Sequence, residues 1–159
     1  MNFMKKYLKW FFVAAVAVFA LLQLTNPAHT NPPVKTDFIA TLNPPPEVAG
    51  MLRAACYDCH SDATRWPWYS HIAPVSWQVV QDVNEGRKHV NLSEWPANQP
   101  DLARKKLEHM SDEIDQGDMP LAKYTLIHTD ARLTAAQRDE LTQWLDAQAD
   151  KLKPPAGAK

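Results

Sequence analysis

The hydrophobic pattern of the first 24 residues differs from that of the remaining chain. Every position from Trp10 to Leu22 is apolar, so this run lacks the polar face that helices on the surface of soluble domains carry. The run is preceded by three basic residues, Lys5, Lys6 and Lys9. Extended from Tyr7 to Leu24 it covers 18 positions, which is long enough for a membrane span. We therefore expect residues 1–24 to form a membrane helix that anchors the protein.

A cleaved signal peptide is the alternative, because basic residues followed by an apolar run of 13 residues are also typical of signal peptides. No small-x-small pair follows Leu24, and the loose match Val18-Phe19-Ala20 lies inside the run. Either way the rest of the chain is exported and the three lysines stay inside. The exported part then holds 17 − 3 = 14 basic and 18 acidic residues, so nothing in its charge indicates binding to nucleic acid.

Residues 25–46 contain six of the 13 prolines in the chain. Such a stretch favours the extended polyproline II conformation, so we expect a semi-rigid linker that holds the domain off the bilayer. The alternative is an ordered strap over the domain surface, near Phe38, Ile39 and Leu42.

The pattern from residue 47 to residue 153 is helical, and no segment alternates polar and apolar positions as a strand would. Pro46, Pro74 and Pro100 each suit the start of a helix. Gly86 lies near the end of the helix that begins at Pro74, and Gly117 is placed to end the helix that begins at Pro100. These signals predict a single all-α domain, and its length agrees with one domain.

The last helix has the clearest start, since Thr134 and Gln137 have the spacing of a capping box. Beyond it, residues 154–159 contain two prolines and a glycine, and we expect a disordered tail there.

The segment Cys56-Tyr-Asp-Cys59-His60 holds the only two cysteines of the chain. Cys-x-x-Cys-His is the attachment motif of c-type haem. Two thiols three positions apart on a helical turn lie on one face, so each can form a thioether with a haem vinyl group. His60 can then bind the iron from the same side. Attachment requires export, which the N-terminal run supplies, and the motif predicts one covalently bound haem c.

Three other uses of this motif fit less well. A structural disulfide between Cys56 and Cys59 would not need His60. A thioredoxin-like redox motif would need a βαβ context, which the helical pattern does not provide. A zinc site would need four ligands, and the sequence has no second cysteine pair.

Several short blocks between residues 45 and 147 add a more specific combination of residues. They are Cys56–Ser61, Thr64–Ser70 with its Trp-Pro-Trp-Tyr core, Pro74–Trp77, Gly86-Arg87, Asn91–Trp95, Gly117–Pro120, Tyr124, His128, Ala131–Thr134 and Trp144-Leu145. Together they resemble the bacterial haem-binding domain family of small, exported, c-type monohaem proteins. The resemblance implies an all-α domain similar to class I cytochrome c, built around one covalently attached haem. Together with the N-terminal run, we expect this domain in the periplasm, tethered to the inner membrane, or soluble there if the run is cleaved.

Met119 is the residue we expect to bind the iron opposite His60. Gly117-Asp-Met119-Pro120 is similar to the Gly-x-Met-Pro segment that precedes the last helix in many bacterial class I cytochromes. Gly117 can end a helix and Pro120 can stiffen the loop that presents the sulfur. A thioether ligand raises the reduction potential, which suits an electron carrier. The alternatives are His128, His71 or an open, water-bound iron.

Seven further side chains are candidates for the haem pocket. They are Trp66, Trp68, Tyr69, Trp77, Arg87, Trp95 and Tyr124. Aromatic rings supply the large apolar surface that a haem needs, and we expect two or three of these rings to contact it. Arg87 could pair with a haem propionate, or it could be a solvated residue that complements the end of its helix.

These features predict a membrane-tethered, periplasmic monohaem cytochrome that transfers single electrons. Its partners would be a membrane oxidoreductase and another periplasmic redox protein. A peroxidase-like enzyme is the first alternative; it needs an open iron and a nearby acid–base group such as His71 or His128. The sequence shows no dedicated pairing for that chemistry, so an enzyme is the less favoured interpretation. A haem-based sensor is the second alternative.

Overall fold

The computed structural model describes residues 2–154, so most of the expected disordered tail, residues 155–159, lies outside the described residues. Within that range the secondary structure is entirely helical, apart from one isolated bridge between Thr36 and Glu94. The expectation of an all-α protein is therefore confirmed for the described part of the chain.

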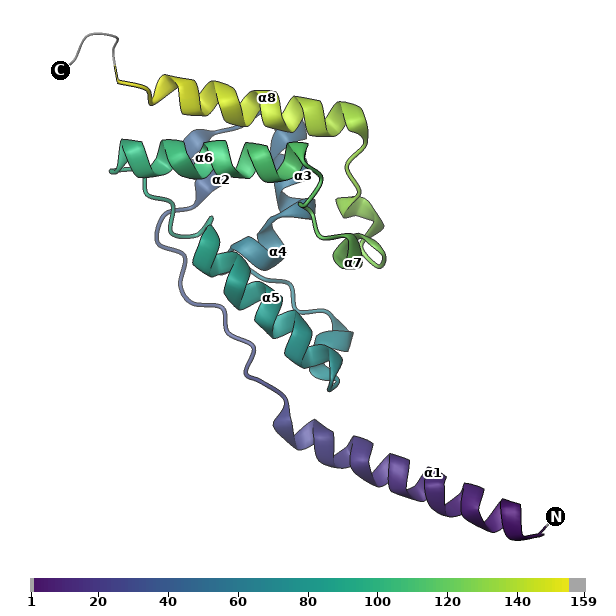
Figure 1. Ribbon diagram of the computed structural model, residues 1–159. Coiled ribbons are helices and arrows are strands. Elements are labelled where there is room, and N and C mark those ends of the chain that lie inside the picture. The colour runs from purple at the N-terminus through teal and green to yellow at the C-terminus, as the bar shows by residue number, and fades with distance from the viewer. Residues whose placement is uncertain (1, 155–159) are drawn as a thin grey trace.

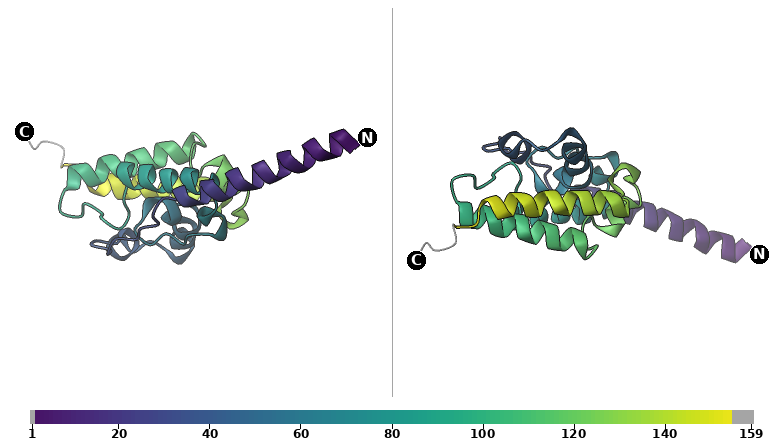
Figure 2. Two further views of the ribbon diagram at one scale, coloured as in Figure 1. Left: turned by 90° about the horizontal axis from the view of Figure 1, so that it is seen from below. Right: turned by 90° about the horizontal axis from the view of Figure 1, so that it is seen from above.

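Helix α1 (Asn2–Leu22) continues into a short 3-10 helix, η1 (Gln23–Thr25). It projects away from the other helices in each of the three views (Figures 1 and 2). Its side chains from Phe3 to Leu21 are exposed. The segment Phe3–Thr25 is long and apolar enough to cross a membrane, and its position near the N-terminus also fits a signal sequence.

The proline-rich segment after η1 lies against the domain. The backbone N–H groups of Thr36 and Phe38 donate to the carbonyls of Ser93 and Leu92, at 2.9 and 2.8 Å. Asp37 then caps a short helix, α2 (Phe38–Leu42), and the Phe38 ring is fully buried. These contacts form the ordered strap that was the alternative to a semi-rigid linker.

The remaining helices surround a common core. They are α3 (Pro46–Ala55), α4 (Tyr57–His60), η2 (Trp68–His71), α5 (Val75–His89), α6 (Pro100–Asp115), α7 (Ala122–Thr125), η3 (Thr129–Ala131) and α8 (Ala135–Lys151). Pro46 and Pro100 occupy the first turns of α3 and α6, and Pro74 precedes α5. Thr134 and Gln137 form the expected capping box of α8. The helix starts predicted from local sequence are therefore confirmed.

Helices α6 and α8 form an antiparallel pair that lies above α4 and α5 in Figure 1, with α3 behind the pair. Leu107 on α6 and Leu141 and Leu145 on α8 are completely buried between them, together with Leu52 from α3. Burying a leucine side chain contributes roughly 1.5–3 kcal/mol, so this apolar seam is a main source of stability.

Gly86 lies in the last turn of α5, near the helix end, as the sequence suggested. A Cβ atom built at Gly86 would stand 2.6 Å from the carbonyl oxygen of Cys59. The glycine therefore allows α5 and α4 to approach each other more closely than any other residue would. Gly117, in contrast, does follow its helix and has the left-handed conformation expected there, with φ = +82°.

The substitution Gly86→Ala tests this close approach. An alanine inside a helix normally stabilises it, but here the clash with Cys59 should lower the free energy of unfolding by about 1–3 kcal/mol. Gly50, in the middle of α3, is the matched control because its Cβ would meet nothing within 4 Å. We expect Gly50→Ala to raise stability by about 0.5–1 kcal/mol. Urea unfolding followed by circular dichroism measures both, and an equal gain in the two variants would contradict the packing described.

Candidate functional site

A cavity of about 410 Å³ lies between α4 and α5 on one side and α6 with the loop after it on the other. Its size falls within the usual range of small-molecule pockets. The side chains and backbone that line it are those of Ala55, Cys56, Cys59, His60, Asp82, Glu85, Gly86, His89, Val90, Leu92, His109, Met110, Glu113, Ile114, Met119, Pro120, Leu121 and Tyr124. The structure thus brings Cys56, Cys59, His60 and Met119, from two distant parts of the sequence, to the wall of one cavity.

The two cysteines share a single helical turn, with Cys56 between α3 and α4 and Cys59 inside α4. The backbone N–H groups of Cys59 and His60 both donate to the carbonyl of Cys56, at 3.2 and 2.9 Å. Both thiols are free and half-buried. Loss of hydration raises the pKa of Cys56 to about 12 and that of Cys59 to about 11. The thiols are therefore protonated at neutral pH, held on a cavity wall and not joined to each other.

The two residues between the cysteines anchor this turn from the other side. The Tyr57 hydroxyl donates to Asp37 on the strap, at 2.9 Å. Asp58 is buried, and its carboxylate accepts hydrogen bonds from the guanidinium of Arg65 and from the hydroxyl of Tyr124. Burial and the neighbouring Asp58 carboxylate raise the pKa of Tyr124, so its phenol stays a donor. These bonds hold the turn that carries the two thiols.

His60 is held by the segment that follows α5. Its Nδ1 atom lies 3.1 Å from the carbonyl oxygen of Val90, and its own carbonyl accepts from the N–H of Leu92 at 2.6 Å. Burial lowers the pKa of His60, so the imidazole is neutral and Nδ1 is the nitrogen that donates to Val90. This arrangement leaves the lone pair of Nε2 available. Metal-binding histidines are commonly oriented in this way, with the other ring nitrogen donating to a carbonyl.

Met119 reaches the cavity because of the way α6 ends. Gly117 donates to the carbonyl of Ile114 at 3.2 Å, and Asp118 donates to that of Glu113 at 3.0 Å, which together form a Schellman motif. The Met119 N–H also bonds to Glu113 at 3.0 Å. The turn therefore directs residues 119–121 back across the end of α6 and against the cavity.

Comparison with known proteins assigns the chain to a family. The model of a family described as "Haem-binding domain" matches residues 17–147, which is most of the chain. The chain belongs to the haem-binding domain family. No curated protein and no solved structure matches it. The cofactor that the family implies is haem.

The cavity of this haem-binding domain is suited to that group by its chemistry. Cys56 and Cys59 offer two thiols, His60 offers an unprotonated imidazole nitrogen and Met119 offers a thioether, all of which are ligand or attachment types used for haem. The other walls include the apolar residues Val90, Leu92, Met110, Ile114 and Leu121. Among residues 2–154, no group of three or more His, Cys, Asp and Glu side chains could hold a bare metal ion.

Only one of the seven side chains proposed from sequence for the pocket, Tyr124, lines the cavity. Trp95 is buried in the core against Phe38, with ring centroids 4.6 Å apart. Trp66 bonds to Asn31 on the strap. The remaining aromatic residues, Trp68, Tyr69 and Trp77, belong to η2 and the start of α5. The tryptophans thus pack the strap and the core or face solvent, because the segment after the motif turns away from the cavity.

The two histidines proposed as alternative iron ligands are also placed elsewhere. The Nε2 atom of His128 lies 2.6 Å from the hydroxyl of Tyr69, and its ring stacks on Tyr124. His71 is exposed, and its ring lies 4.2 Å from that of His29. Neither side chain lines the cavity, whereas Met119 does.

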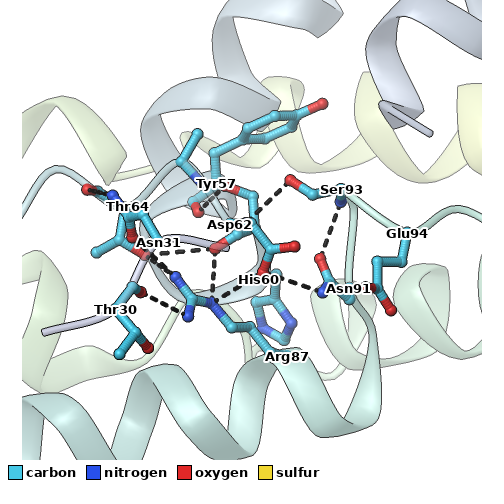
Figure 3. A network of polar contacts seen from close by, with 12 residues as sticks. Thr30, Asn31, Tyr57, His60, Asp62, Thr64, Arg87, Asn91, Ser93 and Glu94 are labelled. Atoms are coloured by element: carbon cyan, nitrogen blue, oxygen red, sulfur yellow. Dashed lines mark hydrogen bonds and ion pairs between the residues drawn. The ribbon is translucent and has the colours of Figure 1, made fainter. Parts of the chain in front are cut away.

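Arg87 binds the strap, not the cavity (Figure 3). Its guanidinium donates to the carbonyls of Ser61 and Thr30, both at 2.8 Å, and to the side chains of Asn31 and Thr64. It also forms an ion pair with buried Asp62, at 3.5 Å. One side chain therefore joins α5, the residues after the haem motif and the strap. Sequence reasoning missed this role because the five partners are scattered over positions 30 to 64.

Sequence reasoning also missed the positioning residues Asp37, Asp58 and Val90. Asp58 lies inside the motif, but the motif does not specify that position, so nothing marked it as buried. Val90 acts through a backbone carbonyl, which any residue could provide.

The substitution Arg87→Lys tests its assignment to the strap. Lysine keeps the charge but loses most of the directed hydrogen bonds, so we expect the free energy of unfolding to fall by about 1–3 kcal/mol. The absorption spectrum of the bound haem should not change. Arg132, an exposed arginine that also donates to backbone carbonyls, is the matched control, and its lysine variant should stay within about 0.5 kcal/mol of wild type. A changed haem spectrum with unchanged stability would return Arg87 to the haem site.

Proposed function

We propose that the protein is a membrane-anchored c-type cytochrome that carries single electrons in the periplasm. The observation that supports this most is that Cys56, Cys59, His60 and Met119 all line one cavity. Haem supplies a centre that accepts and releases one electron. The residues of this chain hold that centre, fix its orientation and set its potential.

Cys56 and Cys59 would hold the haem covalently. Each thiol would add across a vinyl group, with its sulfur bonding to one carbon and its hydrogen going to the other. No oxidant or leaving group is needed. The addition requires cysteines that are not joined in a disulfide, and both are free. The side-chain hydrogen bonds of Tyr57 and Asp58 hold the turn that carries the two sulfurs at the cavity. This lowers the entropy lost on attachment.

Electron transfer is favoured over enzymatic turnover by the donors that the cavity offers. His60 and Met119 lie on different walls, one before α5 and one after α6, so both axial positions of an iron have a candidate ligand. A peroxidase needs an open position and a nearby acid–base group. His71 and His128, the two residues considered for that work, do not line the cavity. A redox protein in the periplasm or inner membrane is the partner that this function requires.

Contacts at the end of α1 support an uncleaved anchor. The Gln23 side chain both donates to and accepts from the backbone of Ala73, and Asn26 bonds to Ser76 and to the carbonyl of His71. The family match also begins at residue 17, inside α1. A segment that is integrated with the domain in this way is better explained as a retained helix than as a signal that is removed.

Covalent attachment is tested on protein exported from a bacterial host that attaches c-type haem. Haem should stay with the wild-type chain through denaturation and acidic organic extraction. In Cys59→Ser it should stay with the chain through Cys56 alone, and the reduced pyridine complex should shift toward the spectrum of a single thioether. The double variant with Cys56→Ser should release all its haem. Mass spectrometry and the pyridine spectrum measure this, and extractable haem in the wild type would contradict the proposal.

Met119 as axial ligand is tested against a second methionine on the same cavity. In Met119→Leu the low-spin spectrum should be lost and the reduction potential should fall on the order of 0.1 V, out of the roughly 0.8 V that axial ligands span. Met110, which lines the cavity from α6, is the control, and Met110→Leu should leave both properties unchanged. Equal behaviour of the two variants would remove Met119 from the iron.

A further inference from the structure

A long uncharged stretch follows the haem motif. Between Arg65 and Asp82 there is no Asp, Glu, Lys or Arg, although such residues make up 22% of the chain. The stretch covers η2 and the first half of α5. Burial in the core does not explain the lack of charged residues, because many side chains of this stretch are exposed.

The exposed side chains of this stretch are mostly apolar or aromatic. Trp68 is 76% exposed, Ile72 36%, Val75 46% and Trp77 40%. All four belong to the junction of η2 and α5, residues 68–77, which we call the junction surface. Tryptophan and aliphatic side chains gathered without charges are typical of the water–membrane interface, where an amphipathic ring is most stable.

Hydrogen bonds tie the junction surface to the end of the candidate membrane span. Gln23, which lies inside the span Phe3–Thr25, is bonded through both atoms of its amide to the backbone of Ala73, at 3.2 and 3.0 Å. The indole of Trp77 donates to the carbonyl of Thr25 at 3.2 Å. These direct contacts place the junction at the depth of the last turn of the span. Figure 1 shows the lower end of α5 beside the end of α1.

We propose that the junction surface is inserted into the interfacial region of the same bilayer that α1 spans. The occupant is lipid, because a bilayer that surrounds the span to Leu24 or Thr25 must also reach residues bonded directly to Gln23 and Thr25. This inference rests on the proposed function in one respect, namely that α1 is a retained membrane helix. Its consequence is that the haem domain has a fixed orientation on the membrane instead of moving freely on a flexible tether.

The strap strengthens this consequence. Arg87 binds Thr30 and Asn31, and His29 contacts the carbonyl of Ser70 at 2.9 Å, so the chain between the span and the domain is held at several points. A domain attached in this way follows the tilt of α1. The orientation of α1 in the bilayer therefore determines which surface of the domain contacts lipid.

Photocrosslinking of the full-length, haem-loaded protein in phosphatidylcholine–phosphatidylglycerol vesicles tests the proposal. The photoreactive residue benzoyl-phenylalanine replaces one residue at a time: Phe12 in α1, Ile72 in the junction surface, or Leu102 near the start of α6. Leu102 is the matched control, since it is 40% exposed, similar to Ile72, but lies in the α6–α8 layer away from α1 (Figure 1). Lipid adducts are counted by intact-mass spectrometry, and only variants with the wild-type haem spectrum are compared. Val75 replaces Ile72 if the latter variant does not fold.

We expect lipid adducts at Phe12 and Ile72, with roughly tenfold fewer at Leu102. Interfacial insertion is only about 5–10 Å deep, so the α6–α8 layer that contains Leu102 stays outside the bilayer. Adducts at Phe12 but equal, low yields at Ile72 and Leu102 would overturn the docking while leaving the anchor intact. Absence of adducts at Phe12 would instead overturn the membrane anchor, and the docking with it. Neither result bears on covalent haem attachment, which the cysteine variants test separately.

Discussion

The close approach of α4 to α5 at Gly86 is the contact on which the rest of the site depends. With no side chain at Gly86, the turn that carries Cys56, Cys59 and His60 can lie directly on α5. The residues that follow α5 then come within hydrogen-bonding distance of His60 through Val90 and Leu92. A bulkier residue at this point would separate the two helices and move the turn with its thiols and imidazole away from α5 and Val90.

The same short segment after α5 also receives the strap. Leu92 and Ser93 accept hydrogen bonds from residues 35–38, and Arg87, one position beyond Gly86, binds the strap closer to the membrane. The haem motif, the end of α5 and the strap therefore form one polar network, seen in Figure 3. Because the strap continues into η1 and α1, the position of the proposed haem site relative to the anchor is determined by side-chain contacts and not by the length of a flexible linker.

Features that depend on neighbouring residues in sequence could be predicted, and features that depend on distant ones could not. The capping box at Thr134 and the glycine turn at Gly117 were recognisable because their partners lie within a few positions. The motif at Cys56 and the loop at Met119 were recognisable for the same reason. The environment of Arg87, the packing of Gly86 and the places of the tryptophans depend on segments 20 or more residues away, and an arginine or tryptophan carries no local signal of which partner it will meet.

The central proposal is that His60 and the Met119 sulfur would both bind the iron of a haem in this cavity. X-ray absorption at the iron edge of the haem-loaded, full-length protein measures the ligand set most directly. The account predicts five nitrogen ligands and one sulfur ligand in both redox states, with the sulfur lost in Met119→Leu. Six nitrogen ligands, or five ligands without sulfur in the wild type, would contradict it.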